Sequence, residues 1–177
     1  FPVITSGDTA DMIDEHSGTG QVVYTATASI DDVTFTLAEV SDAALSIDAT
    51  TGVVILDADP NYEAQSQYSF AVIATSSADI ASGPKAVTLD INNLDEVAPT
   101  ITSATSATVD ENVDSVVIYT ANADDSGDTS DGVVFSLGEN SDSTLGIDEN
   151  TGEVSLEFSV DFEFQQEISF SVIATDA

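Results

Sequence analysis

The sequence lacks the residue types that several classes of function require. It contains no cysteine, no tryptophan, one histidine and a single basic side chain, Lys85. Without cysteine there are no disulfides and no thiolate metal sites, and with one histidine nucleophilic catalysis has almost no components. Nucleic acid is excluded as a partner because phosphate binding needs clustered lysine and arginine. An anionic membrane surface is disfavoured for the same reason.

Long apolar segments are missing as well. No run approaches the ~18–20 apolar residues of a membrane-spanning helix, and the first residues do not form a secretory signal. We therefore expect an internal piece of a longer protein, with no insertion into a membrane.

Acidic side chains, by contrast, are abundant. There are 33 Asp and Glu residues and the formal net charge is −32, whereas hydrophobic residues make up 42% of the chain. The apolar content can build ordinary cores, and the length suits one large domain or two β-sandwiches of roughly 100 residues. Mutual repulsion of the carboxylates destabilises a compact state unless salt or divalent cations offset it. An acidic surface kept for solubility is the alternative reading for most of these residues.

An internal repeat organises the chain. Thr34–Leu56 matches Val134–Leu156, and Tyr62–Thr75 matches Phe162–Thr175, both at an offset of 100 residues. Self-similarity of this kind indicates two copies of one structural unit. The predicted first repeat covers residues 1–98, including a linker at 92–98, and the second covers 99–177.

Each repeat shows the pattern of β-strands. In Tyr68–Thr75 and in Ile168–Thr175 apolar residues occupy every second position, which is typical of strands with one buried face. Asp48 and Asp148 precede Thr-Gly pairs whose Gly52 and Gly152 suit the positive φ of a tight turn, so turn capping is the expected role of both aspartates. No helical periodicity persists, and the predicted fold class is all-β.

The second repeat differs from the first at its end. The first continues after Thr75 to a further strand, Lys85–Ile91, whereas only Asp176 and Ala177 follow Thr175. The sequence therefore predicts a second sandwich that lacks its last strand in this chain. Because an open sheet edge invites pairing, we expect this edge to be masked, or completed by residues outside the chain.

The remaining candidates for function are carboxylates at the ends of strands. They include Glu15 and Glu63, the linker around Asp95, an acidic loop at residues 124–128, and Asp176. If the repeats stack end to end, these groups converge at one junction, where their repulsion demands a cation. Ca²⁺ accepts about six to eight hard oxygen ligands in flexible geometry, whereas Mg²⁺ fits less well. Zinc is disfavoured because thiols are absent and His16 is the only imidazole.

Several short motifs occur in the same order in both repeats. They are Asp14-Glu15-His16 and Asp110-Glu111-Asn112, Asn61-Tyr62-Glu63 and Asp161-Phe162-Glu163, two Ile-Asp-x-x-Thr-Gly turns, a terminal Val-Ile-Ala-Thr-Asp-Ala, and the linker Asn92-Asn93-Leu94-Asp95. In this order the sequence resembles the cadherin-like repeats of large bacterial surface proteins and calcium-dependent adhesins. The resemblance implies two tandem Greek-key β-sandwiches of about seven strands each, with Ca²⁺ in the linker.

The resemblance also implies a set of Ca²⁺ ligands. In the first repeat they are Glu15, Asn61, Glu63, Asp95 and a linker carbonyl near Asn93; in the second they are Asp124, Asp125 or Asp128, together with Asp176. Asn61, Asn92 and Leu94 depart from the family pattern, so fewer or weaker ions are expected than in an animal cadherin. At the far end of the second repeat, Glu111, Asp161 and Glu163 form a poorer half-site that is expected to be empty or completed by solvent.

The expected function is that of a Ca²⁺-binding structural spacer in a large secreted or cell-surface protein, with neighbouring repeats of the same parent chain as partners. The alternative is a carbohydrate- or protein-binding module, although the lack of tryptophan speaks against a sugar platform unless Tyr or Phe residues gather on one sheet face. Homophilic adhesion has no visible aromatic anchor near Phe1. An enzyme is the least favoured class.

Overall fold

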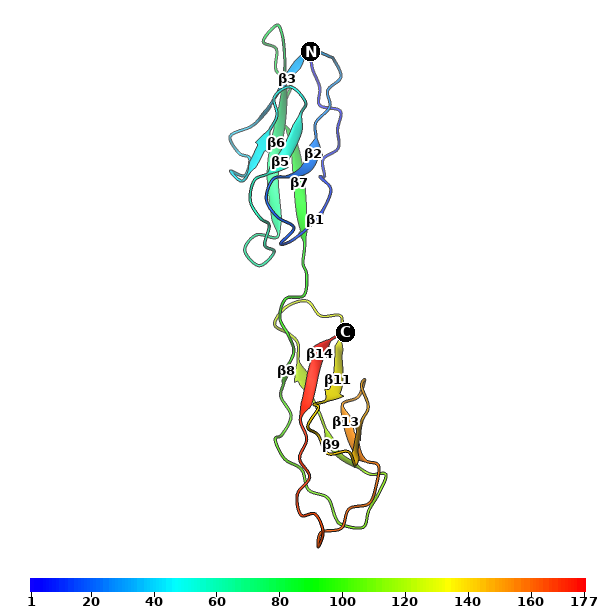
Figure 1. Cartoon of the computed structure of the whole chain (residues 1–177). Coiled ribbons are helices and arrows are strands. Elements are labelled where there is room, and N and C mark those ends of the chain that lie inside the picture. The colour runs from blue at the N-terminus through cyan, green and yellow to red at the C-terminus, as the bar shows by residue number, and fades with distance from the viewer. The chain divides into compact units, whose positions relative to one another are not determined.

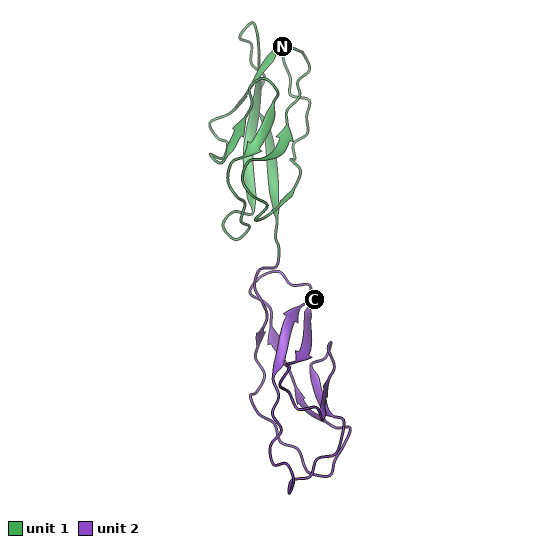
Figure 2. Cartoon of the chain, viewed as in Figure 1, with its two compact units in different colours: residues 1–94 green, residues 95–177 purple.

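A computed structural model describes residues 1–177 and contains strands but no helix (Figure 1). The chain divides into two compact units, Phe1–Leu94 (unit 1) and Asp95–Ala177 (unit 2), shown in green and purple in Figure 2. The all-β expectation is thus confirmed. No element is a long apolar helix of the kind that crosses a membrane.

Unit 1 consists of two sheets. Its strands are β1 (Ile13–Asp14), β2 (Gln21–Thr25), β3 (Val33–Leu37), β4 (Leu45–Ile47), β5 (Val53–Leu56), β6 (Gln67–Ser76) and β7 (Lys85–Asn92). One sheet has the order β1-β7-β6-β3 and the other the order β2-β5-β4. All neighbours are antiparallel except β1 and β7, which run parallel and pair Ile13 with Ile91.

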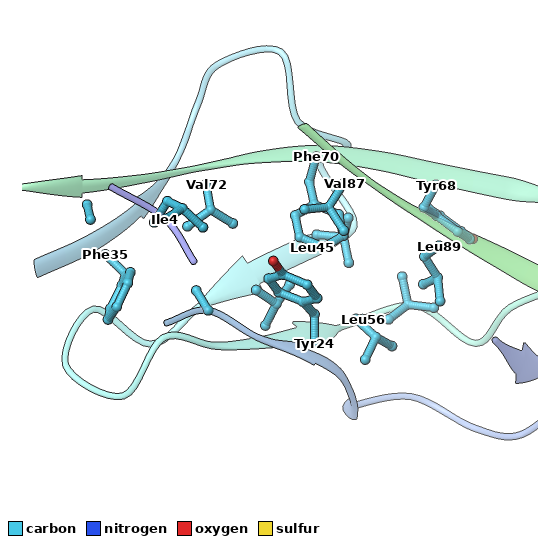
Figure 3. Packing of buried hydrophobic residues seen from close by; sticks show 14 of the residues in the cluster. Ile4, Tyr24, Phe35, Leu45, Leu56, Tyr68, Phe70, Val72, Val87 and Leu89 are labelled. Atoms are coloured by element: carbon cyan, nitrogen blue, oxygen red, sulfur yellow. The ribbon is translucent and has the colours of Figure 1, made fainter. Parts of the chain in front are cut away.

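The core of unit 1 lies between these two sheets. Tyr24 and Leu56 of one sheet point toward Phe70 and Val87 of the other (Figure 3), and the Tyr24 and Phe70 rings meet edge to face at 5.5 Å. The alternation along β6 has its expected effect, because Tyr68, Phe70 and Val72 are buried. The Tyr24 hydroxyl donates to the Gly7 carbonyl at 2.7 Å, so this inward-pointing polar group is satisfied.

The predicted Thr-Gly turns are present in both units. Asp48 Oδ1 accepts hydrogen bonds from the amides of Thr50 and Thr51 at 3.0 and 2.7 Å, and Asp148 Oδ1 accepts the equivalent pair. Gly52 and Gly152 have φ values of 72° and 70°. The turn-capping role predicted for the two aspartates is therefore confirmed.

This capping makes the Asp148 turn sensitive to acid. The amide of Thr151 chiefly, then that of Asn150, lowers the pKa of Asp148 below its ordinary value of 3.8. Because the folded-state pKa is depressed, the stabilisation is complete above pH 3.8 and disappears as the pH falls through the folded value. The stability difference between wild type and Asp148→Asn should therefore be largest at pH 7 and decrease as the pH falls below 3.8. Urea unfolding at several pH values measures it.

Unit 2 repeats this plan with fewer paired residues. Its strands are β8 (Thr100–Ile101), β9 (Val117–Thr120), β10 (Ala123–Asp124), β11 (Val133–Leu137), β12 (Leu145–Ile147), β13 (Glu153–Leu156) and β14 (Val172–Asp176). They form the sheets β12-β13-β9, β11-β14 and β10-β8. In this sheet β14 pairs with β11 alone. The core cluster of unit 2 has three buried residues, Leu145, Val154 and Leu156.

Candidate functional site

The predicted ligands fall into two sets, one on each unit. Glu15, Asn61, Glu63 and Asn93 belong to unit 1, whereas Asp95, Asp124, Asp125, Asp128 and Asp176 belong to unit 2. We describe each set within its own unit. Convergence of both sets on one ion stays a prediction.

Glu15 is the buried member of the unit 1 set. It directly follows β1, and only 1% of its surface is exposed. Its Oε2 accepts the amide of Tyr62 at 2.7 Å, and its Oε1 accepts the amide of Leu94, also at 2.7 Å. One carboxylate therefore ties the chain after β1 to the turn before β6 and to the segment after β7.

The backbone around Glu15 favours its charged form. The amide of Leu94, followed by that of Tyr62, holds the pKa of Glu15 below its ordinary value of 4.5, although burial opposes this. The nearest basic side chain is that of His16, whose Nε2 lies 3.8 Å from Oε2. Glu15 is thus an ionised carboxylate in a site where each oxygen already accepts one hydrogen bond and has a further lone pair.

The other three residues of the unit 1 set are more accessible. Asn61 is half-buried, and its Oδ1 accepts the amide of Ala64 at 2.8 Å, which closes the turn before β6. Glu63 lies exposed in the same turn. Asn93 is half-buried and comes directly after β7. Asn61 therefore has a structural task in the turn, and Glu63 lies exposed beside it.

In unit 2, three predicted residues form a carboxylate cluster. One oxygen each from Asp95, Asp125 and Asp176 lies within 4.8 Å of the others. Asp95 begins the unit, Asp125 follows β10, and Asp176 ends β14. The fold thus joins residues that are far apart in sequence. We refer to them as the triple-aspartate cluster.

The triple-aspartate cluster has the properties of a cation site. Asp125 is oriented by the Ser130 hydroxyl, which donates to Oδ2, while its Oδ1 is buried and receives no hydrogen bond. Burial, and then the charges of Asp95 and Asp125, raise the pKa of Asp176 above its ordinary 3.8. Three hard oxygen donors, one of them unsatisfied and none close to a basic side chain, suit Ca²⁺.

Asp124 and Asp128 are not part of the cluster. Asp124 Oδ1 accepts the Ser126 hydroxyl at 2.6 Å and the Ser126 amide at 3.1 Å, which lowers its pKa. Asp128 Oδ1 accepts the amide of Thr129, and its Oδ2 accepts the amide of Glu96 at 3.3 Å. Both residues shape the acidic loop and the segment beside it. Sequence reasoning missed Ser130, because nothing distinguishes one serine of this loop as the partner of Asp125.

The far end of unit 2 carries the equivalent of the Glu15 arrangement. Glu111, Asp161 and Glu163 approach one another within 4.8 Å, and all three are exposed. Glu111 Oε2 accepts the amide of Phe162 at 3.2 Å, as Glu15 accepts that of Tyr62. Because the exposed Glu111 makes one longer bond in place of two short ones, this half-site is the weaker copy.

Exposed aromatic side chains do not form a platform on a sheet. Phe158, Phe162 and Phe164 are exposed, the last by 92%, but they lie between β13 and β14. Phe1 precedes the first strand, and Tyr62 lies in the turn before β6. The condition that would favour a sugar-binding sheet face is therefore not met.

Comparisons with known proteins agree with this architecture. No protein-family model matches the sequence, and neither does any curated protein. Among solved structures, the human desmocollin-1 ectodomain matches with a TM-score of 0.76 and 17% identity over 99% of this chain. Human protocadherin-24 EC1-2 matches with a TM-score of 0.68 at 15% identity, and Drosophila N-cadherin EC1-4 with 0.68 at 19%.

The lengths of these structures differ from that of this chain. The chain spans 37% of the desmocollin-1 structure, 45% of the N-cadherin structure and 95% of the protocadherin-24 structure. At these identities the likeness establishes the fold, which is that of cadherin ectodomain repeats. The resemblance noted in the sequence is thus confirmed as far as the fold is concerned.

Proposed function

We propose that this chain is a pair of Ca²⁺-binding spacer repeats from a large extracellular protein, and that Asp95, Asp125 and Asp176 bind one ion. The observation that carries the proposal is the triple-aspartate cluster, in which a buried oxygen of Asp125 lacks any donor. A bound Ca²⁺ would supply the positive charge that the cluster lacks. Glu15, Asn61, Glu63 and the Asn93 carbonyl are proposed as the ligand set of unit 1, with Asp124 and Asp128 as further oxygens of the acidic loop.

The position of Asp95 gives the ion a mechanical role. Leu94, the last residue of unit 1, is held through its amide by Glu15, and Asp95, the next residue, belongs to the cluster of unit 2. Two consecutive residues of the connecting segment are thus engaged by different units. Neutralising the cluster would hold Asp95 in place and stiffen that segment, because ion binding favours the ordered arrangement.

The proposal also covers the kind of protein from which these repeats come. The acidic composition and the ordered motifs support a bacterial surface adhesin, in which such repeats hold a binding module away from the cell. Neighbouring repeats of the parent chain would be the principal partners, and homophilic contact between copies would be a secondary interaction.

Calcium should stabilise the protein against heat. At a free concentration ten times the dissociation constant, one site that binds only the folded state adds about 1.4 kcal/mol. For a unit of this size the unfolding temperature should then rise by about 6–11 °C. Differential scanning calorimetry in EGTA, Ca²⁺ and Mg²⁺ measures it, with Mg²⁺ expected to have the smaller effect. Equal transitions in EGTA and Ca²⁺ would contradict the proposal.

The variant Asp176→Asn should change the stability of unit 2 in opposite directions without metal and with Ca²⁺. The raised pKa of Asp176 means that its charge is disfavoured in the folded state, so stability falls as the pH rises from 3.8 through the folded value. Without metal at pH 7, removing this charge should stabilise unit 2. When Ca²⁺ is added, the unfolding temperature of the same variant should rise much less than that of the wild type. Asp131→Asn removes one exposed charge outside the cluster and should do neither.

The spacer role is tested separately by small-angle scattering. With Ca²⁺ the wild-type chain should give the narrower distribution of interatomic distances at long range, and with EGTA the broader one. Identical curves alongside a clear calorimetric response would leave calcium binding intact and remove the stiffening role.

A further inference from the structure

The segment that joins the acidic loop to β11 contains the one Asp-Gly pair of the sequence, Asp131-Gly132. An aspartate followed by glycine is prone to backbone rearrangement, because no side chain then hinders attack of the next amide nitrogen on the carboxyl carbon. In a folded protein the reaction also requires that the carboxyl group and the backbone around it can move. The contacts of this segment therefore decide whether the pair reacts.

Asp131 is held less firmly than the aspartates that precede it. The carboxylates of Asp124, Asp125 and Asp128 each accept a hydrogen bond from within the loop. Asp131, by contrast, is exposed and makes no hydrogen bond through its side chain or its backbone. Its carboxyl group can therefore rotate toward the amide of the next residue.

Gly132 is required by the conformation of the chain where it enters β11. Its φ of 115° lies in the region that favours glycine, so another residue would be strained there. A Cβ at this position would have no atom closer than 3.9 Å, so the space beside the peptide is open. The conformation that demands glycine thus also leaves Asp131 without a shielding neighbour.

The amide of Gly132 is connected to the triple-aspartate cluster. It donates to Ser130 Oγ at 3.1 Å, and the Ser130 hydroxyl in turn donates to Asp125 Oδ2. On the other side of Gly132, Val133 begins β11 and lies opposite Asp176 in β14. A change in the length of the backbone at this point would therefore act on two of the three carboxylates.

We propose that Asp131-Gly132 is a site of spontaneous isomerisation to isoaspartate, and that this modification weakens Ca²⁺ binding by the triple-aspartate cluster. The isomerisation stands on the contacts of the segment alone, whereas its effect on calcium rests on the proposed function. Because the rearrangement needs only water, it would proceed in any long-lived copy of the protein.

The reaction has two steps. The Gly132 nitrogen attacks Asp131 Cγ and forms a C–N bond, and one water leaves with the carboxyl hydroxyl and the amide proton. Water then adds to the main-chain carbonyl carbon of Asp131 and breaks its bond to the Gly132 nitrogen. The chain now runs through Asp131 Cγ, and the former main-chain carbonyl is a free carboxylate. Composition and charge are the same before and after.

The product has one additional methylene carbon in its backbone between residues 131 and 132. Ser130 and Val133 lie on opposite sides of this insertion, so they cannot both keep their present positions. We expect the Ser130 hydroxyl to lose its contact with Asp125, because β11 is fixed by its pairing with β14. Loss of such an orienting partner should lower the Ca²⁺ affinity by about tenfold or more.

Incubation of the full chain tests the chemical step. The protein is kept warm at neutral pH in EGTA, and isoaspartate is located by isoaspartyl methyltransferase labelling and peptide mapping. It should accumulate at residues 131–132 at least about tenfold faster than at Asp31-Asp32, the equivalent position of the first repeat, where no glycine follows. A synthetic peptide of residues 128–135 gives the unconstrained rate, and the folded chain should react within about tenfold of it.

The variant Asp131→Glu is the matched control. It keeps the charge, but its longer side chain would have to close a larger ring, which forms far more slowly, so no isomerisation is expected. Isothermal titration calorimetry with Ca²⁺ should resolve incubated wild type into two populations whose affinities differ by about tenfold or more. The weaker population should equal the isoaspartate fraction, and incubated Asp131→Glu should bind Ca²⁺ as the fresh protein does.

Three results would count against separate parts of this reasoning. A folded chain that reacts about a hundredfold more slowly than the peptide would overturn the proposal, because the segment would then be held. Isoaspartate that forms without any change in Ca²⁺ affinity would remove the link to the cluster. Fresh protein that binds no Ca²⁺ would refute the proposed function, whereas the isomerisation, measured in EGTA, would still be decided by peptide mapping.

Discussion

Replacing Glu15 by alanine should lower the unfolding temperature of unit 1 by on the order of 10 °C, even in EGTA. Glu15 is 1% exposed and accepts the amides of Tyr62 and Leu94 at 2.7 Å each. The variant leaves two backbone donors without their acceptor and opens a void behind β1. The cost arises from the loss of buried hydrogen bonds and is therefore independent of metal.

The internal repeat supplies a matched control for this variant. Glu111 occupies the equivalent position in unit 2, but it is exposed and accepts one bond of 3.2 Å. Glu111→Ala should therefore shift unfolding by no more than a few degrees. Calorimetry gives the transitions, and hydrogen exchange of the β6 segment assigns the change to unit 1. Equal effects of the two variants would show that the buried bonds of Glu15 are not the source.

Gly52→Ala should destabilise unit 1 by about 3 kcal/mol or more. Gly52 has a φ of 72°, and an added Cβ would lie 2.6 Å from the Ala26 carbonyl oxygen and 3.1 Å from the Phe35 ring. Neither neighbour can retreat easily, because the Ala26 amide is bonded to the Gly52 carbonyl at 2.8 Å and Phe35 is part of the core. The free-energy cost of the backbone strain therefore adds to the cost of the steric overlap.

Urea unfolding followed by far-ultraviolet circular dichroism measures this loss. Gly83→Ala is the control, since a Cβ at Gly83 meets nothing within 4 Å and its φ is not positive. It should leave stability unchanged or raise it slightly by restricting the unfolded chain. A Gly52→Ala variant as stable as Gly83→Ala would mean that the turn relaxes without cost.

Much of the fold could be predicted because strand patterns are local. The alternation in Tyr68–Thr75 identifies a strand with one buried face, and Thr51-Gly52 identifies a tight turn, without knowledge of distant residues. The repeat then placed the same elements in unit 2. What the repeat alone did not indicate is that the second long strand covers only Val172–Asp176 and that the residues equivalent to β1 form no strand.

The candidate site was predictable in part only. The motif order pointed to acidic residues at the ends of strands, but it gave Asp124, Asp125 and Asp128 as equivalent candidates. Their local hydrogen bonds distinguish them: Asp124 is engaged by Ser126, whereas Asp125 has a buried oxygen without a donor. Such a distinction depends on loop conformation, which sequence spacing does not encode.

By itself the sequence determined the class of fold, the repeat, the turns and the acidic character of the chain, because each follows from residue type and short-range spacing. Tertiary structure decided which carboxylates meet, since Asp95, Asp125 and Asp176 become neighbours only when β10 and β14 are packed in one unit. It also decided that Glu15 is buried. These properties arise from contacts between distant segments, and the free energy of such contacts depends on distance in space rather than along the chain.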